Sequence, residues 1–268
     1  MRLARSNEET LLDAPGSVAV TNANETGCEV LICNNDGHTV TRHLLEGGAP
    51  HALRSSEVLL HKHLNVPDGV SVTRDGRWIA LSNHATHNVL LYQNSPALNA
   101  ETEPVGILRR VHFPHGLRFS GDGRHLFVAD AGAPYLHIYA QDADGWRGVR
   151  NPVATVTIMD DALFQKGRHN PEEGGAKGLD LDRNSNVLVV TSECQPLAFF
   201  AVSDLMQQMA AVPSVQEESR RGLDHELTLM QEIRRLRAEK SVEADDLRKT
   251  VSWRITAPLR RVKSIFRR

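Results

Sequence analysis

The chain has 268 residues, 31 basic and 33 acidic side chains, and a formal net charge of −2. That length suits one domain with an extension, and the near balance of charge argues against a nucleic-acid-binding protein. Three cysteines without a Cys-x-x-Cys pair argue against a disulfide framework or a structural zinc site. With neither a secretory signal nor an apolar run of the ~18 residues that span a membrane, a cytoplasmic protein with free thiols is expected.

One phrase recurs along the chain and predicts the fold. It reads Pro67-Asp68-Gly69, returns as Pro114-His115-Gly116, and has fainter copies at Lys177-Gly178 and Pro15-Gly16. Each copy continues as an alternating apolar strand, a turn rich in Asp, Gly or Asn, and a second apolar strand. Asp-Gly dipeptides close tight hairpins because glycine tolerates positive φ. Four short antiparallel strands per repeat are typical of a β-propeller blade.

The sequence therefore predicts an all-β fold, a small or truncated β-propeller over residues 1–203. Blades are expected at about 15–64, 67–112, 114–160 and 176–203. Their fourth strands are expected at Gly106–Val111 in the second blade and Val153–Ile158 in the third. The last blade has three strands, so a strand over Glu8–Asp13 is expected to complete it and remove both edges. A ring shared by two chains and an open arc are the alternatives.

The stretch from Pro114 to Asp130 resembles the repeats of YVTN-type and lactonase-like propeller proteins, and the resemblance covers about residues 15–203. It implies the blade architecture. It does not imply one reaction, because that superfamily mixes enzymes with binding modules. The similar gluconolactonase-like enzymes bind a metal through a Glu-Asn-Asn-Asp set, of which only Asn83 and Asp130 match here.

In a propeller, the loops before the first strands and after the second strands share one face. The candidate catalytic residues are those at the blade starts: Asp68, His115 and Lys177. The candidate ligand-binding residues at the second-strand ends are Asn34, Asn83, His84, Asp130 and Glu193. Oxygen and imidazole donors suit a divalent cation, for which the candidates are Asp68, Asn83, His115 and Asp130.

Two arguments oppose a metal at this face. Lys177 would repel a cation, and Asp and Asn residues at such positions commonly cap turns and satisfy loop amides. No cofactor is therefore the first expectation, and one divalent metal ion in the central channel is the alternative. The long loop Phe164–Gly175 supplies further binding candidates for an anionic sugar or a protein, namely Arg168, His169 and Glu172.

The pattern becomes helical in residues 204–251. Leu229, Ile233 and Leu236 follow a 4–3 spacing, which is typical of a short coiled coil that pairs with a second copy or another protein. Residues 252–268 form a basic amphipathic tail. Its stretch Ser252–Arg260 resembles a motif of bacterial surface-polysaccharide glycosyltransferases. The tail residues expected to contact a partner or an anionic membrane are Trp253, Arg254, Arg260, Arg261, Lys263, Phe266 and Arg267.

Two functional hypotheses follow. The first is a non-enzymatic propeller adaptor that works with a glycosyltransferase at the inner face of the cytoplasmic membrane, with self-association through the helix or the ring. The second is a metal-dependent, lactonase-like hydrolase of a sugar lactone or ester. Neither hypothesis calls for nucleic acid.

Overall fold

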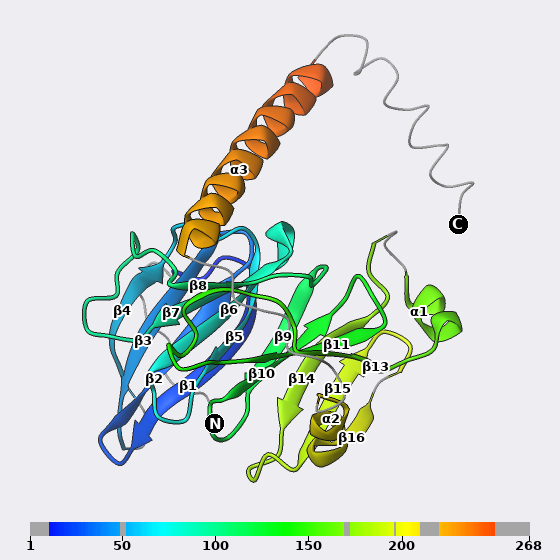
Figure 1. Ribbon diagram of the computed structural model, residues 1–268. Helices are drawn as coiled ribbons and strands as arrows, with labels where there is room; N and C mark the ends of the chain where they lie inside the picture. Colours follow the sequence, from blue (N-terminus) through cyan, green and yellow to red (C-terminus); the bar gives the residue numbers. More distant parts are fainter. Residues whose placement is uncertain (1–10, 49–51, 169–171, 196, 210–219, 250–268) are drawn as a thin grey trace. The chain divides into compact units, whose positions relative to one another are not determined.

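The computed structural model describes residues 11–48, 52–168, 172–195, 197–209 and 220–249. The chain divides into two compact units, Met1–Glu226 and Leu227–Arg268. In the described residues the first unit is mostly β and holds four sheets, which Figure 1 colours from blue to yellow. An all-β fold is therefore confirmed for this unit.

The first sheet consists of four consecutive antiparallel strands. They are β1 (Pro15–Asn24), β2 (Gly27–Asn34), β3 (Thr39–Glu46) and β4 (Leu53–Leu60). The second sheet begins in the same way. Its antiparallel strands are β5 (Pro67–Val72), β6 (Trp78–Asn83), β7 (Asn88–Gln93) and β8 (Gly106–Leu108). The strand expected over Gly106–Val111 ends early, because Arg110 has a φ of +63° and cannot continue an extended strand.

A fifth strand, β12 (Gly148–Arg150), joins the second sheet from the third repeat and pairs with β8 in parallel. The sequence pattern did not predict this strand. The third sheet has the expected four strands. They are β9 (Pro114–Phe119), β10 (His125–Asp130), β11 (Tyr135–Ala140) and β13 (Ala154–Thr157).

The fourth sheet has three strands in the described part of the chain: β14 (Ala176–Leu181), β15 (Val187–Ser192) and β16 (Ala198–Ala201). Most of the strand expected over Glu8–Asp13 lies outside the described residues, and Leu11–Asp13 are not extended into a strand. The Asp13 N–H instead donates to Asn34 Oδ1 at 3.0 Å, beside the first sheet.

The predicted hairpins form as the turn chemistry requires. Gly76 and Gly123 have φ values of +72° and +71°. Before each glycine, an aspartate accepts a backbone hydrogen bond: Asp75 Oδ1 from the Arg77 N–H and Asp122 Oδ1 from the Arg124 N–H, both at 3.0 Å. The two turns are thus built alike, as the repeated sequence predicts.

Helical segments connect and follow the sheets. They are η1 (His84–Thr86), α1 (Asp161–Gly167), α2 (Val202–Met209) and α3 (Arg220–Lys249). Asp160 caps α1 by accepting from the Leu163 N–H. The helix expected in residues 204–251 is present as α3, of which the second unit holds the part from Leu227 on; its pairing as a coiled coil stays a prediction. Among the described residues, no helix combines the length and apolar character that crossing a membrane requires.

The four sheets are stacked in chain order. Their first strands, β1, β5, β9 and β14, lie side by side in that order. Apolar side chains fill the space between the second and third sheets, including Leu91 and Leu117, and between the third and fourth, including Phe127 and Leu188. In the described residues no packing of that extent joins β14 back to β1. In the part of the chain that the structure describes, the sheets therefore form an open, propeller-like series and not a closed four-blade ring.

Candidate functional site

Three neighbouring first strands each contribute one polar side chain from the same position. Asp68, His115 and Lys177 are the second residues of β5, β9 and β14, each directly before a glycine. Because these strands lie side by side, the three side chains come from the same, N-terminal end of three neighbouring strands. We call these residues, with His84 and Glu173, the Glu173 cluster.

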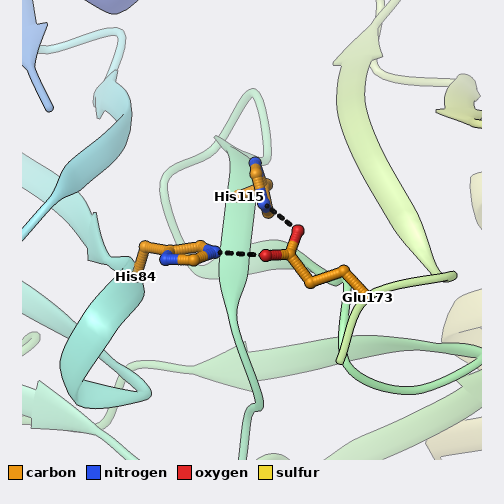
Figure 2. Close-up of side chains that lie close together, drawn as sticks. All are labelled: His84, His115 and Glu173. Carbon is orange, nitrogen blue, oxygen red and sulfur yellow. Dashed lines mark hydrogen bonds and ion pairs between the residues drawn. The ribbon is translucent and has the colours of Figure 1, made fainter. Parts of the chain in front are cut away.

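Glu173 lies at the centre of the cluster, between two imidazoles (Figure 2). Its Oε1 atom lies 3.1 Å from His84 Nε2, and its Oε2 atom lies 3.0 Å from His115 Nε2. Lys177 Nζ forms an ion pair with the same Oε2 atom and lies 3.3 Å from His115 Nε2. Two imidazoles and one ammonium group therefore share a single carboxylate.

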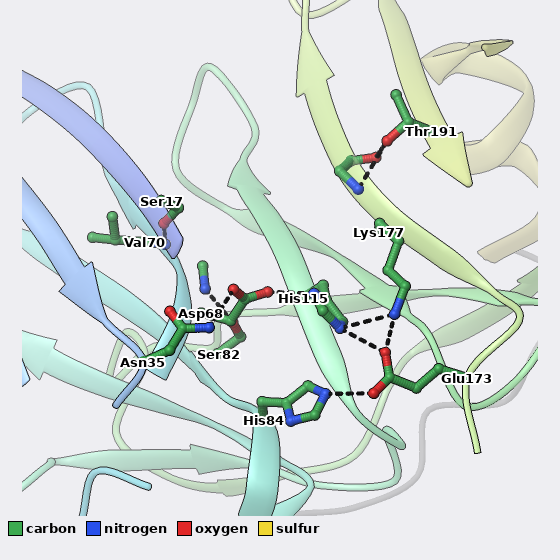
Figure 3. Close-up of polar contacts among 12 residues, drawn as sticks. Ser17, Asn35, Asp68, Val70, Ser82, His84, His115, Glu173, Lys177 and Thr191 are labelled. Atoms are coloured by element: carbon green, nitrogen blue, oxygen red, sulfur yellow. Dashed lines mark hydrogen bonds and ion pairs between the residues drawn. The ribbon is translucent and has the colours of Figure 1, made fainter. Parts of the chain in front are cut away.

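Asp68 completes the cluster on the far side of His115 (Figure 3). Its carboxylate forms an ion pair with His115 Nδ1, and the Asn35 side-chain amide donates to Asp68 Oδ1 at 3.2 Å. Both ring nitrogens of His115 thus face a carboxylate. The Asp68–His115–Glu173 chain fixes the orientation of the imidazole, as a second carboxylate does behind a metal-bound histidine.

Two backbone hydrogen bonds position Glu173, although it lies in a loop. The N–H groups of Gly174 and Gly175 donate to the Ala131 carbonyl at 3.0 and 2.9 Å, just after β10. A Cβ atom at position 175 would approach the carbonyl oxygen of Asp130 to 2.2 Å, so only glycine allows this close approach. The loop end is therefore tied to the third sheet, and Glu173 comes with it.

The cluster is partly buried, and burial shifts its titration. Burial, followed by the charge on His115, lowers the pKa of His84 to about 4, so this imidazole is neutral at neutral pH. Burial also lowers the pKa of Lys177, against the opposing charges of Asp68 and Glu193. Burial alone would raise the pKa of Asp68, but hydrogen bonds from His115 and Asn35 hold it below its ordinary value.

Three of the residues predicted for this face have other roles. Asn34, Asn83 and Asp130 are fully buried at the ends of their second strands. Asn83 accepts from the Asn65 N–H and donates to the His63 carbonyl, while Asn34 donates to Thr41 Oγ1. These bonds satisfy backbone and side chains around each strand end, so these residues are built into the packing and not into the cluster.

Asp130, a metal candidate from the sequence, is engaged in the same way. Its Oδ2 atom accepts from the His112 N–H and lies 2.9 Å from His137 Nε2, and its Oδ1 atom accepts from the Gly132 N–H. Asn83 and Asp130 therefore do not join Asp68 and His115 in one metal site. The resemblance to the gluconolactonase-like metal set does not extend to the geometry.

The loop candidates divide between two places. Arg168 stacks over the Phe164 ring at 5.7 Å and donates to Gln165 Oε1, whereas Glu172 lies near enough to His84 to oppose the lowering of its pKa. His169 lies outside the described residues. Sequence reasoning selected this loop but missed Glu173. The adjacent Gly174-Gly175 pair was the available signal, because paired glycines permit a close backbone approach.

A group of three potential metal ligands lies within this cluster. One ligand atom each from His84, His115 and Glu173 falls within 4.8 Å of the others. Two imidazoles and one carboxylate are the donor set of many catalytic zinc and non-haem iron sites. Lys177 lies in the same cluster, where its ammonium group pairs with Glu173. That it opposes a cation there stays a prediction.

The tail residues named above, from Trp253 to Arg267, lie outside the described residues, so the membrane and glycosyltransferase expectations stay predictions. The three cysteines are free thiols; the buried Cys33 has a raised pKa because of desolvation.

No protein-family model matches the chain, and no curated protein matches it. Solved structures do. The hydrazine synthase of Kuenenia stuttgartiensis is 15% identical with a TM-score of 0.48, over 74% of this chain and 49% of that one. The "putative 6-phosphogluconolactonase" of Bacteroides uniformis is 19% identical with a TM-score of 0.47, over 68% of this chain and 52% of that one.

A functionally unknown protein from Desulfotomaculum acetoxidans is 15% identical with a TM-score of 0.49, over 70% of this chain and 55% of that one. The chain thus spans about half the length of the solved structures it matches. None of these likenesses says what the chain binds or catalyses, and none supports a link to a glycosyltransferase.

Proposed function

We propose that this chain is a metal-dependent hydrolase, built on a propeller-like series of sheets, that cleaves a sugar lactone or ester. One observation carries the proposal. His84 and His115 both direct Nε2 at the carboxylate of Glu173, and the ligand atoms of the three residues lie within 4.8 Å of one another. A divalent ion held by such a set acts as a Lewis acid and lowers the pKa of a bound water.

The protein's own residues prepare this site in two ways. Asp68 pairs with His115 Nδ1, which leaves Nε2 as the atom that faces Glu173. His84, with its pKa of about 4, offers a neutral imidazole at neutral pH, and a neutral ring is what a metal requires. Both features favour a ligand role over a merely structural ion pair.

Lys177 has a distinct part in this proposal. Its ammonium group contacts Glu173 Oε2 and lies 3.3 Å from His115 Nε2, the two atoms that would hold a metal. Binding of a cation would therefore displace Lys177 from the carboxylate. The freed ammonium group would then be available beside the site to neutralise negative charge that develops on a substrate oxygen.

The first test is metal binding by the purified full-length chain. We expect about one equivalent of Zn²⁺ in a competition titration against a chromophoric chelator, and the double variant His84→Ala/His115→Ala should lose on the order of 100-fold in affinity. His125→Ala is the matched control, because His125 lies in β10 of the same sheet as His115 and outside the cluster. Wild-type affinity in the double variant would refute the site.

The second test is activity. The metal-loaded chain should hydrolyse at least one member of a panel of sugar δ-lactones, γ-lactones and acetyl esters, and a chelator should abolish the reaction. A chain that binds metal at these residues but hydrolyses none of the panel would leave a binding protein, and the enzymatic part of the proposal would be wrong.

The adaptor hypothesis rests on the tail at residues 252–268, which lies outside the described residues, and the comparisons give it no support. It stays a prediction, to be tested by binding of the full chain to anionic vesicles.

A further inference from the structure

The first sheet leaves one apolar face uncovered in the described part of the chain. Val18 and Val20 of β1 point away from the second sheet and are 54% and 61% exposed. In each later sheet, the same face of the first strand is packed against the preceding sheet. The corresponding residues are Val70, Leu117 and Leu179, with exposures of 1%, 1% and 8%.

The fourth sheet is also uncovered, on the face that points away from the third sheet. Phe199 of β16 pairs with Val189 of β15, which in turn pairs with Asp180 of β14. The Phe199 side chain is 67% exposed. At the same register in the second and third sheets stand Leu91 and Ile138, both fully buried. Those two residues are buried because a following sheet covers them, whereas Phe199 has no following sheet in the described residues.

The internal junctions define what would cover these faces. At the first junction, Ser17 Oγ of the first sheet accepts from the Val70 N–H of the second. At the second junction, Ser71 Oγ accepts from the Phe119 N–H. Each sheet thus presents one kind of face to its successor and another to its predecessor. The uncovered face of the fourth sheet is the one that would face a successor. The uncovered face of the first sheet is the one that would face a predecessor.

The two faces do not cover each other in the described part of the chain, because β14 and β1 lack a contact as extensive as those between the other first strands. A further strand at the edge of β16 would not cover Phe199 either. It would extend the sheet in the hydrogen-bonding direction, whereas a covering sheet packs on the face, about 10 Å away.

We infer that a second copy of this chain covers both faces. The first sheet of each copy packs on the fourth sheet of the other, so that two identical contacts related by a two-fold axis close a ring of eight sheets. Closed propellers contain four to eight blades, so eight sheets fall within the range that such rings allow. Each contact continues the series of junctions already present inside the chain. This inference does not depend on the metal site.

The experiment is sedimentation equilibrium of the full chain, with two kinds of charge substitution. The wild type should sediment with twice the chain mass of 29.7 kDa. Because each contact uses a different face from each copy, Val20→Lys and Phe199→Glu should each weaken the dimer, on the order of 100-fold in Kd. Tyr135→Glu, at another exposed aromatic residue, is the control and should leave the dimer intact.

Val18→Lys and Val187→Glu serve as second variants at the two faces, should either first variant fail to fold by circular dichroism. A monomeric wild type would overturn the inference, as would a dimer that survives substitution at both faces. If substitutions at only one of the two faces weaken the dimer, the inference is also overturned, because two like faces would then pack together. If substitutions at each face weaken the dimer, the inference is supported.

Discussion

Two of the carboxylate–imidazole pairs in the described residues, Asp130–His137 and Asp68–His115, differ in what surrounds them. In the Asp130–His137 pair, both partners are buried, and His137 Nδ1 is hydrogen-bonded to Thr155 Oγ1 at 2.9 Å. In the Asp68–His115 pair, both side chains are partly exposed, at 15% and 20%, and the second ring nitrogen of His115 faces a carboxylate that three groups share.

The difference shows that residue type alone does not mark a functional site. Every hydrogen-bonding atom of the Asp130–His137 side chains has a partner in the surrounding strands or their connecting segments. The pair therefore stabilises the third sheet and has no capacity for a ligand. The Asp68–His115 pair ends in Glu173, which His84 and Lys177 also contact. The Asp130 carboxylate, by contrast, accepts from two backbone N–H groups besides its contact with the His137 ring.

The two pairs should differ most in how much each contributes to the free energy of unfolding. Asp130→Ala leaves the N–H groups of His112 and Gly132 and the His137 ring without their acceptor, so it should lower the free energy of unfolding by about 3 kcal/mol. Asp68→Ala, at a more exposed pair, should cost about 1 kcal/mol. Urea unfolding followed by circular dichroism measures both. Equal losses would mean that the two pairs play the same structural role.

Acid should lower the stability of the protein through His84, which neighbours the Asp68–His115 pair. The pKa of His84 is lowered to about 4 from 6.5, so below pH 6.5 the unfolded chain takes up a proton at this ring that the folded chain does not. The free energy of unfolding should therefore fall by about 2 kcal/mol between pH 6.5 and pH 4 through this group. Its contribution is fully present above pH 6.5.

His84→Gln removes this ionisation, so the variant should lose less stability than the wild type over the same interval. Urea titrations at pH 7.5, 5.5 and 4.5 compare the two proteins. Parallel losses in wild type and variant would assign the acid sensitivity to other groups and would contradict the lowered pKa.

The smallest expected effect concerns how Asp68 positions His115. Asp68→Asn keeps the shape of the side chain but removes the charge behind His115 Nδ1, so Zn²⁺ affinity should fall about 10-fold while the fold is retained. Asn35→Ala, which removes only the amide that donates to Asp68, should have a smaller effect. Unchanged affinity in Asp68→Asn would leave Asp68 a packing residue.

Much of this architecture was predictable from the sequence because short local motifs determine it. The Asp75-Gly76 and Asp122-Gly123 turns fix their hairpins, and the repeated Pro-x-Gly start aligns Asp68 with His115 on adjacent strands. The parallel strand β12 was not predictable in this way, because three residues with one buried valine carry no periodicity. Its place depends on where the chain passes after the third repeat.

The centre of the site escaped prediction for a similar reason. Glu173 lies in a loop, and its position depends on two hydrogen bonds to the Ala131 carbonyl, some 40 residues earlier in the chain. Conversely, Asn83 and Asp130 looked like ligands because they end buried strands. Whether an amide or carboxylate there points to solvent or into the packing is decided by backbone groups on other segments, such as Asn65 and His112.

Strand β12 has a consequence for how the protein unfolds. It belongs by sequence to the third repeat and by hydrogen bonding to the second sheet, and the Trp146 just before it is fully buried, with its indole N–H donating to the Gly123 carbonyl. Repeat arrays whose units touch only their neighbours can unravel one unit at a time. Here the second sheet cannot release β12 without disturbing the third, so these two sheets should exchange their amide protons as one cooperative block.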